Sequence, residues 1–268
     1  MVGGYAGKVL EINLSNGRVR EEPLDLSLAK SLIGCLGVAS KIMLERIDRY
    51  VDPLSPENKL IFATGVLTGS TAPAASKSIV ISRSPLTNIW GESVFSANSG
   101  IELKRAGYDM LLVDGKAEKP VYLWIHDGSV EIRDASGIWG MDTFTACESI
   151  KRDLGERRAA VVSIGPAGER LVRLSSIISD NGRAAGRCGL GAVMGSKNLK
   201  AIAIRGTKDV TVAKPDEFLE FVKEFHERMK GPATKKYRTL GTPENVLVHN
   251  ALHCMPTRNY NNAHFEAA

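Results

Sequence analysis

Two arginines stand four residues apart in the glycine-rich stretch Gly182–Lys200, and their side chains are suited to binding phosphate. A guanidinium is a planar donor that can engage two phosphate oxygens at once. Arg183 and Arg187 flank Ala184 and Gly186, and more glycines follow. Small residues let backbone N–H groups approach a ligand closely, and turns with converging N–H groups favour anions. These residues predict a cradle for a phosphorylated, polar cofactor.

The same stretch is also consistent with a tight structural turn whose arginines are solvated. Two common phosphate-binding loops are excluded by residue order. Lys197 follows Gly195-Ser196, so the Walker order GxxxxGK[ST] is absent. The glycines also do not open the helix of a first βα unit, as a dinucleotide-binding GxGxxG would. The residues alone leave both interpretations open, the anion site and the structural turn.

Two other segments carry side chains of lower specificity. Lys77, within Ala72–Ser78, can meet a phosphate as a point charge, although a solvated lysine is the commoner case. Trp90–Ser93 and Ser96–Gly100 contribute hydroxyl and amide groups that can line a pocket. Taken by themselves, these two small polar segments predict a loop.

Cysteine spacing argues against a metal or iron–sulfur site built by this chain alone. No cysteine lies within four residues of another, so there is no CxxC pair with the usual ligand spacing. We expect reduced thiols in a cytoplasmic protein. The cysteines are Cys35, Cys147, Cys188 and Cys254.

Short strands must position the candidate residues. Asn16-Gly17 and Asp127-Gly128 each separate two alternating segments, and such pairs signal β-hairpins because both turn positions require positive φ. The first hairpin joins 8–14 to 18–20, and the second joins 121–125 to 130–132. Further strands are predicted at 60–63, 78–82, 110–113, 161–164, 172–175 and 201–204.

Helical spacing of apolar residues predicts one helix over 26–48, weakened by two internal glycines, and another over 142–154, capped by Asp142 or Thr143. Many short strands without βα alternation predict an α+β fold.

The pattern changes after Arg205-Gly206-Thr207. We expect one domain over 1–208 and the start of a helical domain over 209–268, with helices at 214–230 and 243–252.

Composition fits a globular protein with 43% hydrophobic and 24% charged residues. The net charge of +5 is spread along the chain, without the clustered stripe and interleaved aromatics of a nucleic-acid face. No apolar run approaches the roughly 18 residues of a membrane span. The N-terminus lacks the regions of a signal peptide. We expect a cytoplasmic protein with no nucleic-acid and no membrane partner.

In this order, the pieces of the chain resemble the aldehyde ferredoxin oxidoreductase family. The resemblance covers essentially the whole chain and is most specific at 183–200. The other matching segments are Lys8–Leu14, Asp52–Asn58, Ser84–Thr87, Glu102–Asp109, Gly115–Tyr122, Glu131–Ser136 and Ile164–Glu169.

The resemblance implies an oxidoreductase that converts aldehydes to carboxylic acids and passes electrons to ferredoxin. Members of the family hold tungsten, or sometimes molybdenum, between two pterins, with a [4Fe-4S] cluster nearby. Their N-terminal domain has two β-sheets and a few helices and forms the base for the bis-pterin. Two helical domains supply the cluster cysteines, the substrate channel and the acid/base groups.

By this resemblance the chain is the N-terminal domain plus the start of the second domain. The family's CxxCxxxC cluster motif follows the Arg258-Asn259-Tyr260 region, beyond this chain. We therefore assign no catalytic and no metal residues here and expect the isolated chain to be inactive. Its partners would be ferredoxin and either a second copy or a complementary C-terminal subunit. The alternative is a non-catalytic pterin-binding or interaction module with the same fold.

Family positions transfer residue by residue. Arg183, Ala184, Gly186 and Arg187 match the pterin-contacting motif, and these are the safer assignments. Cys188 stands at a usual glycine position.

The remaining assignments depart from the family pattern. Lys77 stands where the family usually has arginine, which keeps the charge but loses the fork geometry. Val94 stands where an asparagine commonly contacts the pterin, and Ser96 stands at a contact glycine. These three complete the predicted cofactor-binding set.

Overall fold

The computed structural model describes residues 3–96, 98–180 and 182–266. The chain divides into two compact units, Met1–Lys214 and Pro215–Ala268. The predicted boundary at 208/209 lies six residues before this division. Each unit is described by itself.

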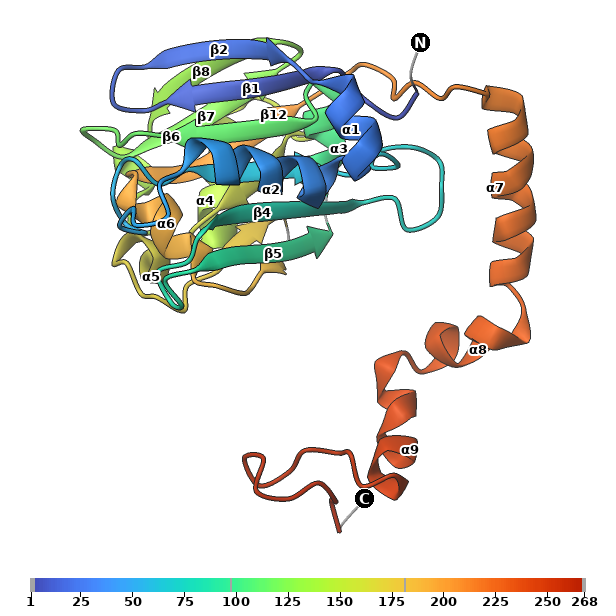
Figure 1. The fold of residues 1–268 in the computed structure, drawn as a ribbon. Coiled ribbons are helices and arrows are strands. Elements are labelled where there is room, and N and C mark those ends of the chain that lie inside the picture. Colours follow the sequence, from blue (N-terminus) through green and yellow to red (C-terminus); the bar gives the residue numbers. More distant parts are fainter. Residues whose placement is uncertain (1–2, 97, 181, 267–268) are drawn as a thin grey trace. The chain divides into compact units, whose positions relative to one another are not determined.

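The first unit contains, in its described residues, two six-stranded sheets (Figure 1). The first sheet has the order β2-β1-β6-β3-β4-β5, and all its pairs are antiparallel except β1 with β6. Its strands are β1 (Lys8–Asn13), β2 (Arg18–Pro23), β3 (Leu60–Thr64), β4 (Lys77–Arg83), β5 (Trp90–Ser96) and β6 (Met110–Asp114).

The second sheet has the order β11-β10-β9-β12-β7-β8, and β12 runs parallel to β7. Its strands are β7 (Val121–His126), β8 (Ser129–Asp134), β9 (Ala160–Ser163), β10 (Ile177–Ser179), β11 (Arg183–Ala185) and β12 (Leu199–Arg205).

The main core lies between the two sheets. Alternate residues of each strand face it, as the period of two in a pleated strand requires. A single buried cluster therefore combines residues of both sheets, among them Leu10, Phe62 and Val80 of the first and Leu123, Val162 and Ile202 of the second. Burial of this apolar surface is the main force that holds the sheets together.

Helices cover the outer faces. α1 (Leu26–Leu32) and α2 (Cys35–Arg46) pack on the first sheet, and α4 (Thr143–Leu154) packs on the second. The other helices of this unit are α3 (Asn98–Arg105), α5 (Pro166–Glu169) and α6 (Leu190–Ser196), with a 3-10 turn at Ser136–Ile138. Two sheets with helices of this kind confirm the predicted α+β fold.

Most predicted elements are present, with specific differences. The prediction of a single helix over 26–48 is wrong, because Ile33 and Gly34 adopt positive φ values of 57° and 64° and divide the segment into α1 and α2. Asp127 and Gly128 both have positive φ, as the hairpin required. In the first hairpin Gly17 has positive φ and Asn16 does not, and the connection from Leu14 to Gly17 is longer than a two-residue turn.

Two segments have a secondary structure that differs from the prediction. Residues 172–175 form turns, and the strand lies at 177–179 instead. Residues 90–96, predicted as part of a loop, form the edge strand β5. Of the 96–100 segment, Ala97 lies outside the described residues.

The regular elements of the second unit are helical: α7 (Pro215–Met229), α8 (Pro232–Thr239), a 3-10 turn at Thr242–Asn245, and α9 (Val246–Ala251). The helix predicted at 214–230 is confirmed by α7. The helix predicted at 243–252 begins as the 3-10 turn, and α8 was not predicted. Among the described residues no helix combines the length and apolarity needed to span a membrane.

Candidate functional site

The edges of the two sheets meet where β5 of the first lies beside β11 of the second. The Ser93 hydroxyl accepts a 3.1 Å hydrogen bond from the backbone N–H of Arg187. The hydroxyl oxygens of Ser99 and Ser179 lie 2.7 Å apart. The backbone N–H of Asn98 donates to the Asp180 carboxylate at 3.0 Å. Polar contacts therefore join β5 to the segment after β11, and the start of α3 (Asn98–Arg105) to the end of β10.

Three predicted cofactor residues lie on the first-sheet side of this junction. Lys77 begins β4 and is paired directly with Ser96 of β5, and Val94 lies two residues before Ser96. Residues opposite one another, and residues two apart in a strand, point to the same face. Lys77 is exposed and Val94 keeps 52% of its surface accessible. An ammonium, a hydroxyl and an apolar side chain thus share one accessible face.

The other four predicted residues lie on the second-sheet side. Arg183 and Ala184 belong to β11, and Gly186 and Arg187 follow it directly. All four are exposed. The structure therefore brings three separate sequence segments to one junction. We call the seven residues the edge site: Lys77, Val94, Ser96, Arg183, Ala184, Gly186 and Arg187.

The edge site is cationic and its charges are not neutralised within the chain. Among the described residues, the guanidiniums of Arg183 and Arg187 and the ammonium of Lys77 have no hydrogen-bonding or ion-pair partner. Each guanidinium keeps five N–H donors and the ammonium three. The site therefore suits an anionic ligand with a flat ring system, such as a phosphorylated pterin: the cations can meet phosphate oxygens, and the exposed Val94 can contact a ring.

The glycines beyond Arg187 have a packing role instead. A Cβ added to Gly189 would lie 1.9 Å from the carbonyl oxygen of Arg173, and one added to Gly195 would lie 2.0 Å from that of Gly168. The short helix α6 that contains Gly195 is entirely buried, and Gly189 directly precedes it. These two glycines are therefore explained by close packing, and only 183–187 of this stretch stays accessible enough to be a candidate anion site.

The two lysines that end the stretch are buried as well. The Lys197 ammonium donates to the carbonyl oxygens of Pro56 and Gly115, at 3.0 and 3.1 Å. Burial lowers the pKa of Lys197 to about 8. The Lys200 ammonium is paired with the carboxylate of Glu169. Both lysines stabilise loops, and neither faces the edge site.

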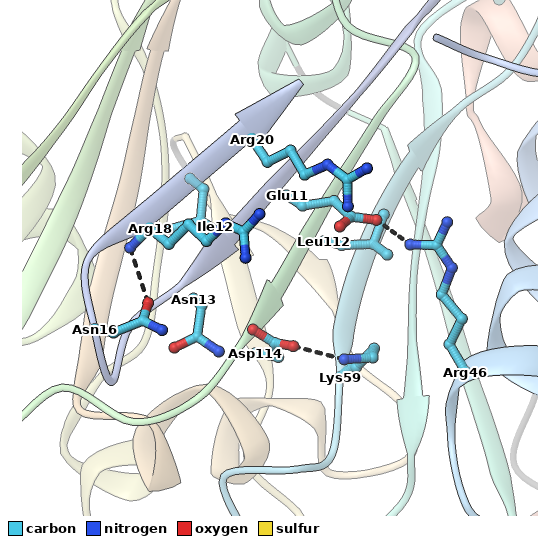
Figure 2. Close-up of a pocket in the computed structure, with 10 residues that line it drawn as sticks. All are labelled: Glu11, Ile12, Asn13, Asn16, Arg18, Arg20, Arg46, Lys59, Leu112 and Asp114. Carbon is cyan, nitrogen blue, oxygen red and sulfur yellow. Dashed lines mark hydrogen bonds and ion pairs between the residues drawn. The ribbon is translucent and has the colours of Figure 1, made fainter. Parts of the chain in front are cut away.

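A charged cavity of about 190 Å³ lies over the first sheet beside β1, and Figure 2 shows its lining residues. Its charges are largely paired with one another. Arg46 binds Glu11 and Glu22, and Lys59 lies 2.6 Å from Asp114. Because these groups satisfy each other, the cavity is explained as a surface ion-pair network and is a weaker candidate than the edge site.

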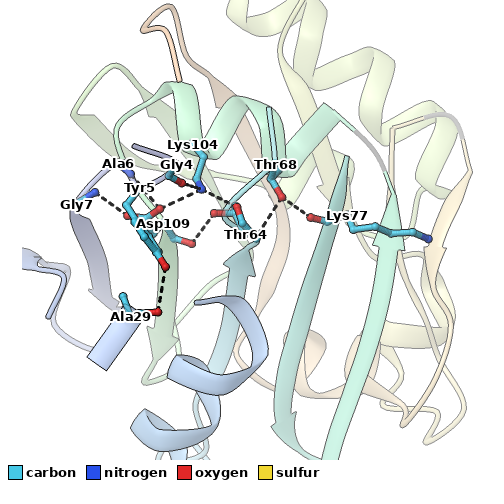
Figure 3. A network of polar contacts seen from close by, with 11 residues as sticks. Gly4, Tyr5, Ala6, Gly7, Ala29, Thr64, Thr68, Lys77, Lys104 and Asp109 are labelled. Carbon is cyan, nitrogen blue, oxygen red and sulfur yellow. Dashed lines mark hydrogen bonds and ion pairs between the residues drawn. The ribbon is translucent and has the colours of Figure 1, made fainter. Parts of the chain in front are cut away.

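A buried ion pair supports the segment that leads to Lys77 (Figure 3). The side chain of Lys104 is 2% exposed, and its ammonium donates to the carbonyl oxygens of Gly4 and Gly65, both at 2.6 Å. The Asp109 carboxylate lies 3.3 Å from the same ammonium and accepts backbone N–H bonds from Ala6 and Gly7. One cation thus ties the N-terminal segment to the loop after β3.

Thr68 continues this network to the edge site. Its hydroxyl accepts from the backbone N–H of Gly65 at 2.9 Å and donates to the carbonyl oxygen of Lys77 at 2.7 Å. In Figure 3 the Lys77 side chain extends away from the network. The network therefore fixes the backbone of Lys77 and leaves its ammonium accessible.

Thr68 and Ser179 were missed from the sequence, and Ser93 and Ser99 were indicated only as members of polar segments that could line a pocket. Ser93, Ser99, Ser179 and Thr68 are small hydroxyl residues whose partners lie 3 to 94 positions away along the chain. The adjacent β-branched and aromatic residues Val94 and Phe95 were the available signal for β5. No local pattern indicates which hydroxyl will meet which backbone group.

Within the described part of the chain, no three side chains of His, Cys, Asp or Glu gather closely enough to hold a metal ion. The edge site instead presents cationic and hydroxyl groups, whose N–H and O–H donors are suited to an anionic ligand. The fold and this site define an α+β domain of two sheets with an accessible cationic site at their junction.

Comparison with known proteins identifies the family. Residues 9–206 match the family described as aldehyde ferredoxin oxidoreductase, N-terminal domain. The chain is 45% identical to the tungsten-containing aldehyde ferredoxin oxidoreductase of Pyrococcus abyssi, over 99% of this chain and 44% of that protein. It is 38% identical to the aliphatic sulfonate oxidoreductase, WOR-like subunit, of Pyrococcus furiosus, over 76% of this chain and 35% of that protein. The chain belongs to the aldehyde ferredoxin oxidoreductase family, as the resemblance predicted.

A solved structure shows the same fold. It is the active site complex BamBC of benzoyl coenzyme A reductase in complex with 1,5-dienoyl-CoA. The match has a TM-score of 0.84 and 41% identity, and covers 86% of this chain and 35% of that chain. The present chain spans less than half the length of the curated relatives it matches.

Proposed function

We propose that this chain is the cofactor-holding base of a tungsten-pterin aldehyde:ferredoxin oxidoreductase. The observation that carries the proposal is the edge site, where Lys77, Arg183 and Arg187 come together from separate segments with their charges unpaired. Exposed cations without partners are expected where an anion is to be bound.

Each edge-site residue has a role that follows from its chemistry. Arg183 and Arg187 present forked donors for phosphate oxygens, and Lys77 adds a point charge. Val94 offers an apolar surface to the pterin ring, and Ser96 offers a hydroxyl. Ala184 and Gly186 are small and let the ligand approach the backbone. When bound, the metal-pterin supplies the two-electron oxidation of the aldehyde.

Acid–base chemistry and electron exit belong to other parts of the enzyme in this proposal. The edge site contains cations, hydroxyls and apolar groups, and none of them is a general base at neutral pH. The [4Fe-4S] cluster, its cysteine ligands and the contact with ferredoxin would lie in the sequence that the longer relatives have beyond this match. The complete assembly would be either a homo-oligomer or a pair with a complementary C-terminal subunit.

Aldehyde is preferred as the substrate because of the relatives' names. The relatives that match nearly the whole chain at 44–45% identity are named aldehyde ferredoxin oxidoreductases. The same domain also occurs in proteins named for a sulfonate and for a coenzyme A thioester. This variety supports a shared base for the cofactor, with substrate choice made elsewhere.

The test is the tungsten and pterin content of the protein purified natively, with any subunit that accompanies it. Arg183→Gln with Arg187→Gln should lower both contents about tenfold or more, since two charge-assisted contacts are lost. Lys116→Gln with Lys119→Gln removes the same charge from exposed positions outside the edge site and should leave both unchanged. Equal retention in both double variants would refute the proposal. Retained cofactor without aldehyde-dependent reduction of ferredoxin, even with every accompanying subunit present, would favour the non-catalytic alternative.

A further inference from the structure

A second, larger cleft of about 570 Å³ lies at the end of the first unit that carries α3. It is bounded by α3, by the turn between α4 and β9, and by the loop after β3. Five basic residues line it: Arg105, Lys151, Arg157, Arg158 and Arg205. Two carboxylates, Glu102 and Asp180, also line it. The lining therefore carries a formal charge of +3, five cations less two anions.

Both carboxylates are engaged inside the protein. Glu102 is 7% exposed and accepts from the Arg205 guanidinium at 2.9 Å and from the backbone N–H of Gly206 at 2.8 Å. The two oxygens of Asp180 accept from the backbone N–H groups of Asn98 and Val161. In the described part of the chain, neither carboxylate forms an ion pair with Arg157 or Arg158.

The outer cations are available to a ligand. Arg157 and Arg158 are exposed, and among the described residues their guanidiniums have no partner. Arg105 has one distant contact, 4.0 Å from Glu102. A concave surface with charges of one sign focuses the potential and raises the local concentration of counter-ions. The cleft also has the size of a small-molecule site and exceeds what a single phosphate would fill.

We propose that this cleft binds a small diphosphate-bearing anion. Two adjacent arginines provide forked donors for neighbouring phosphate groups, and Lys151 and Arg105 add charge from the other walls. The site does not depend on the edge site, because the two share no cationic residue. Asn98 and Asp180, which are joined by a backbone-to-carboxylate hydrogen bond, line the cleft as well.

The test is calorimetric titration of the full chain with inorganic pyrophosphate. Arg157→Gln with Arg158→Gln should weaken pyrophosphate binding about tenfold or more. Arg157→Lys with Arg158→Lys keeps the charge but loses the forked donors, so its affinity should lie between that of the glutamine variant and that of the unchanged protein. Raising the salt concentration should weaken binding by the unchanged protein. Circular dichroism would confirm that the variants fold, as expected for exposed positions.

Lys116→Gln with Lys119→Gln is the matched control. These exposed lysines directly precede β7, whose first residue Val121 pairs with Leu199. Leu199 and Arg205 stand at opposite ends of β12, so the lysines lie away from the cleft. The control variant has the same change in net charge as the arginine variant. Equal weakening in the control, or no binding by the unchanged protein, would overturn the proposal. So would loss of binding in Arg183→Gln with Arg187→Gln alone, which would place the anion at the edge site. Binding of an acidic peptide without binding of pyrophosphate would also overturn it.

Discussion

Ser93 accepts a hydrogen bond from the backbone N–H of Arg187 across 3.1 Å, and 94 positions of sequence separate the two residues. Ser93 is 3% exposed, so its hydroxyl is held in one place by the packing around it. The contact fixes the segment after β11 against β5. The backbone position of one edge-site arginine is therefore set by a buried side chain outside the edge site.

Replacing Ser93 by alanine should lower the free energy of unfolding by about 1 kcal/mol, because the Arg187 N–H loses its partner in a partly buried place. Urea unfolding would measure this. Ser129→Ala, at an exposed position of β8, is the control and should change stability by less than about 0.5 kcal/mol. Tungsten and pterin content should also fall in Ser93→Ala and not in Ser129→Ala. Indistinguishable variants would show that this contact does not position the arginine.

The pair of Lys104 and Asp109 should be among the most sensitive sites in the fold. Lys104→Met removes a buried cation and leaves Asp109 without its ionic partner, which should cost about 3–5 kcal/mol. Lys41→Met is the control, because Lys41 and Glu45 form an exposed pair whose loss should cost less than about 0.5 kcal/mol. Adding Asp109→Asn to Lys104→Met should cost less than the sum of the single changes. Additive losses would mean that the two residues act independently.

The sequence was sufficient for features that depend on local chemistry. Asp142 or Thr143 was predicted as a helix cap, and the structure shows that it is Asp142, whose carboxylate accepts from the backbone N–H groups of Phe144 and Thr145. Asp127-Gly128 was predicted as a tight turn for its tolerance of positive φ, which both residues adopt. Both signals are contained within four residues, so the chain itself encodes them.

The misassigned features depend on tertiary packing. Residues 172–175 have the composition of a strand but form turns, while the less distinctive β10 pairs between β9 and β11. The glycines at 189–195 look like a phosphate loop in sequence, yet they serve close approach of α6 to the backbone of 168–176. Glycine permits both roles, and only the neighbouring chain decides between them. For the edge site, the sequence indicated the residue types, and the fold brings them to one junction.

Thr68 should position Lys77 through the backbone. Thr68→Val keeps the side-chain volume but removes the hydroxyl that bridges Gly65 and the Lys77 carbonyl. Because Thr68 is 3% exposed, the loss should cost about 1–3 kcal/mol and loosen the start of β4. Thr68→Ser retains the hydroxyl and should restore most of the tungsten and pterin content that Thr68→Val loses. Failure of the serine variant to restore it would indicate that the methyl group matters and the hydrogen bonds do not.

Lys197 should make stability depend on alkaline pH. Its pKa is about 8 in the folded protein, because burial disfavours the charged form, against an ordinary value of 10.5. Below pH 8 both states hold the proton, and above pH 10.5 neither does. Between these values the unfolded state binds more protons, so the free energy of unfolding should rise with pH, by up to about 3 kcal/mol.

Other groups titrate in the same range with the opposite sign, so the comparison must be made with Lys197→Met. Burial raises the pKa of the Cys147 thiol and of the Tyr122 phenol, and both should lower stability as pH rises through this region. The methionine variant keeps these contributions and lacks that of Lys197. Subtracting its urea-unfolding free energies from those of the unchanged chain should therefore leave a difference that grows from pH 8 towards pH 10.5. A difference that is constant with pH would mean that Lys197 keeps its proton in the folded state, with the carbonyl oxygens of Pro56 and Gly115 compensating for its burial.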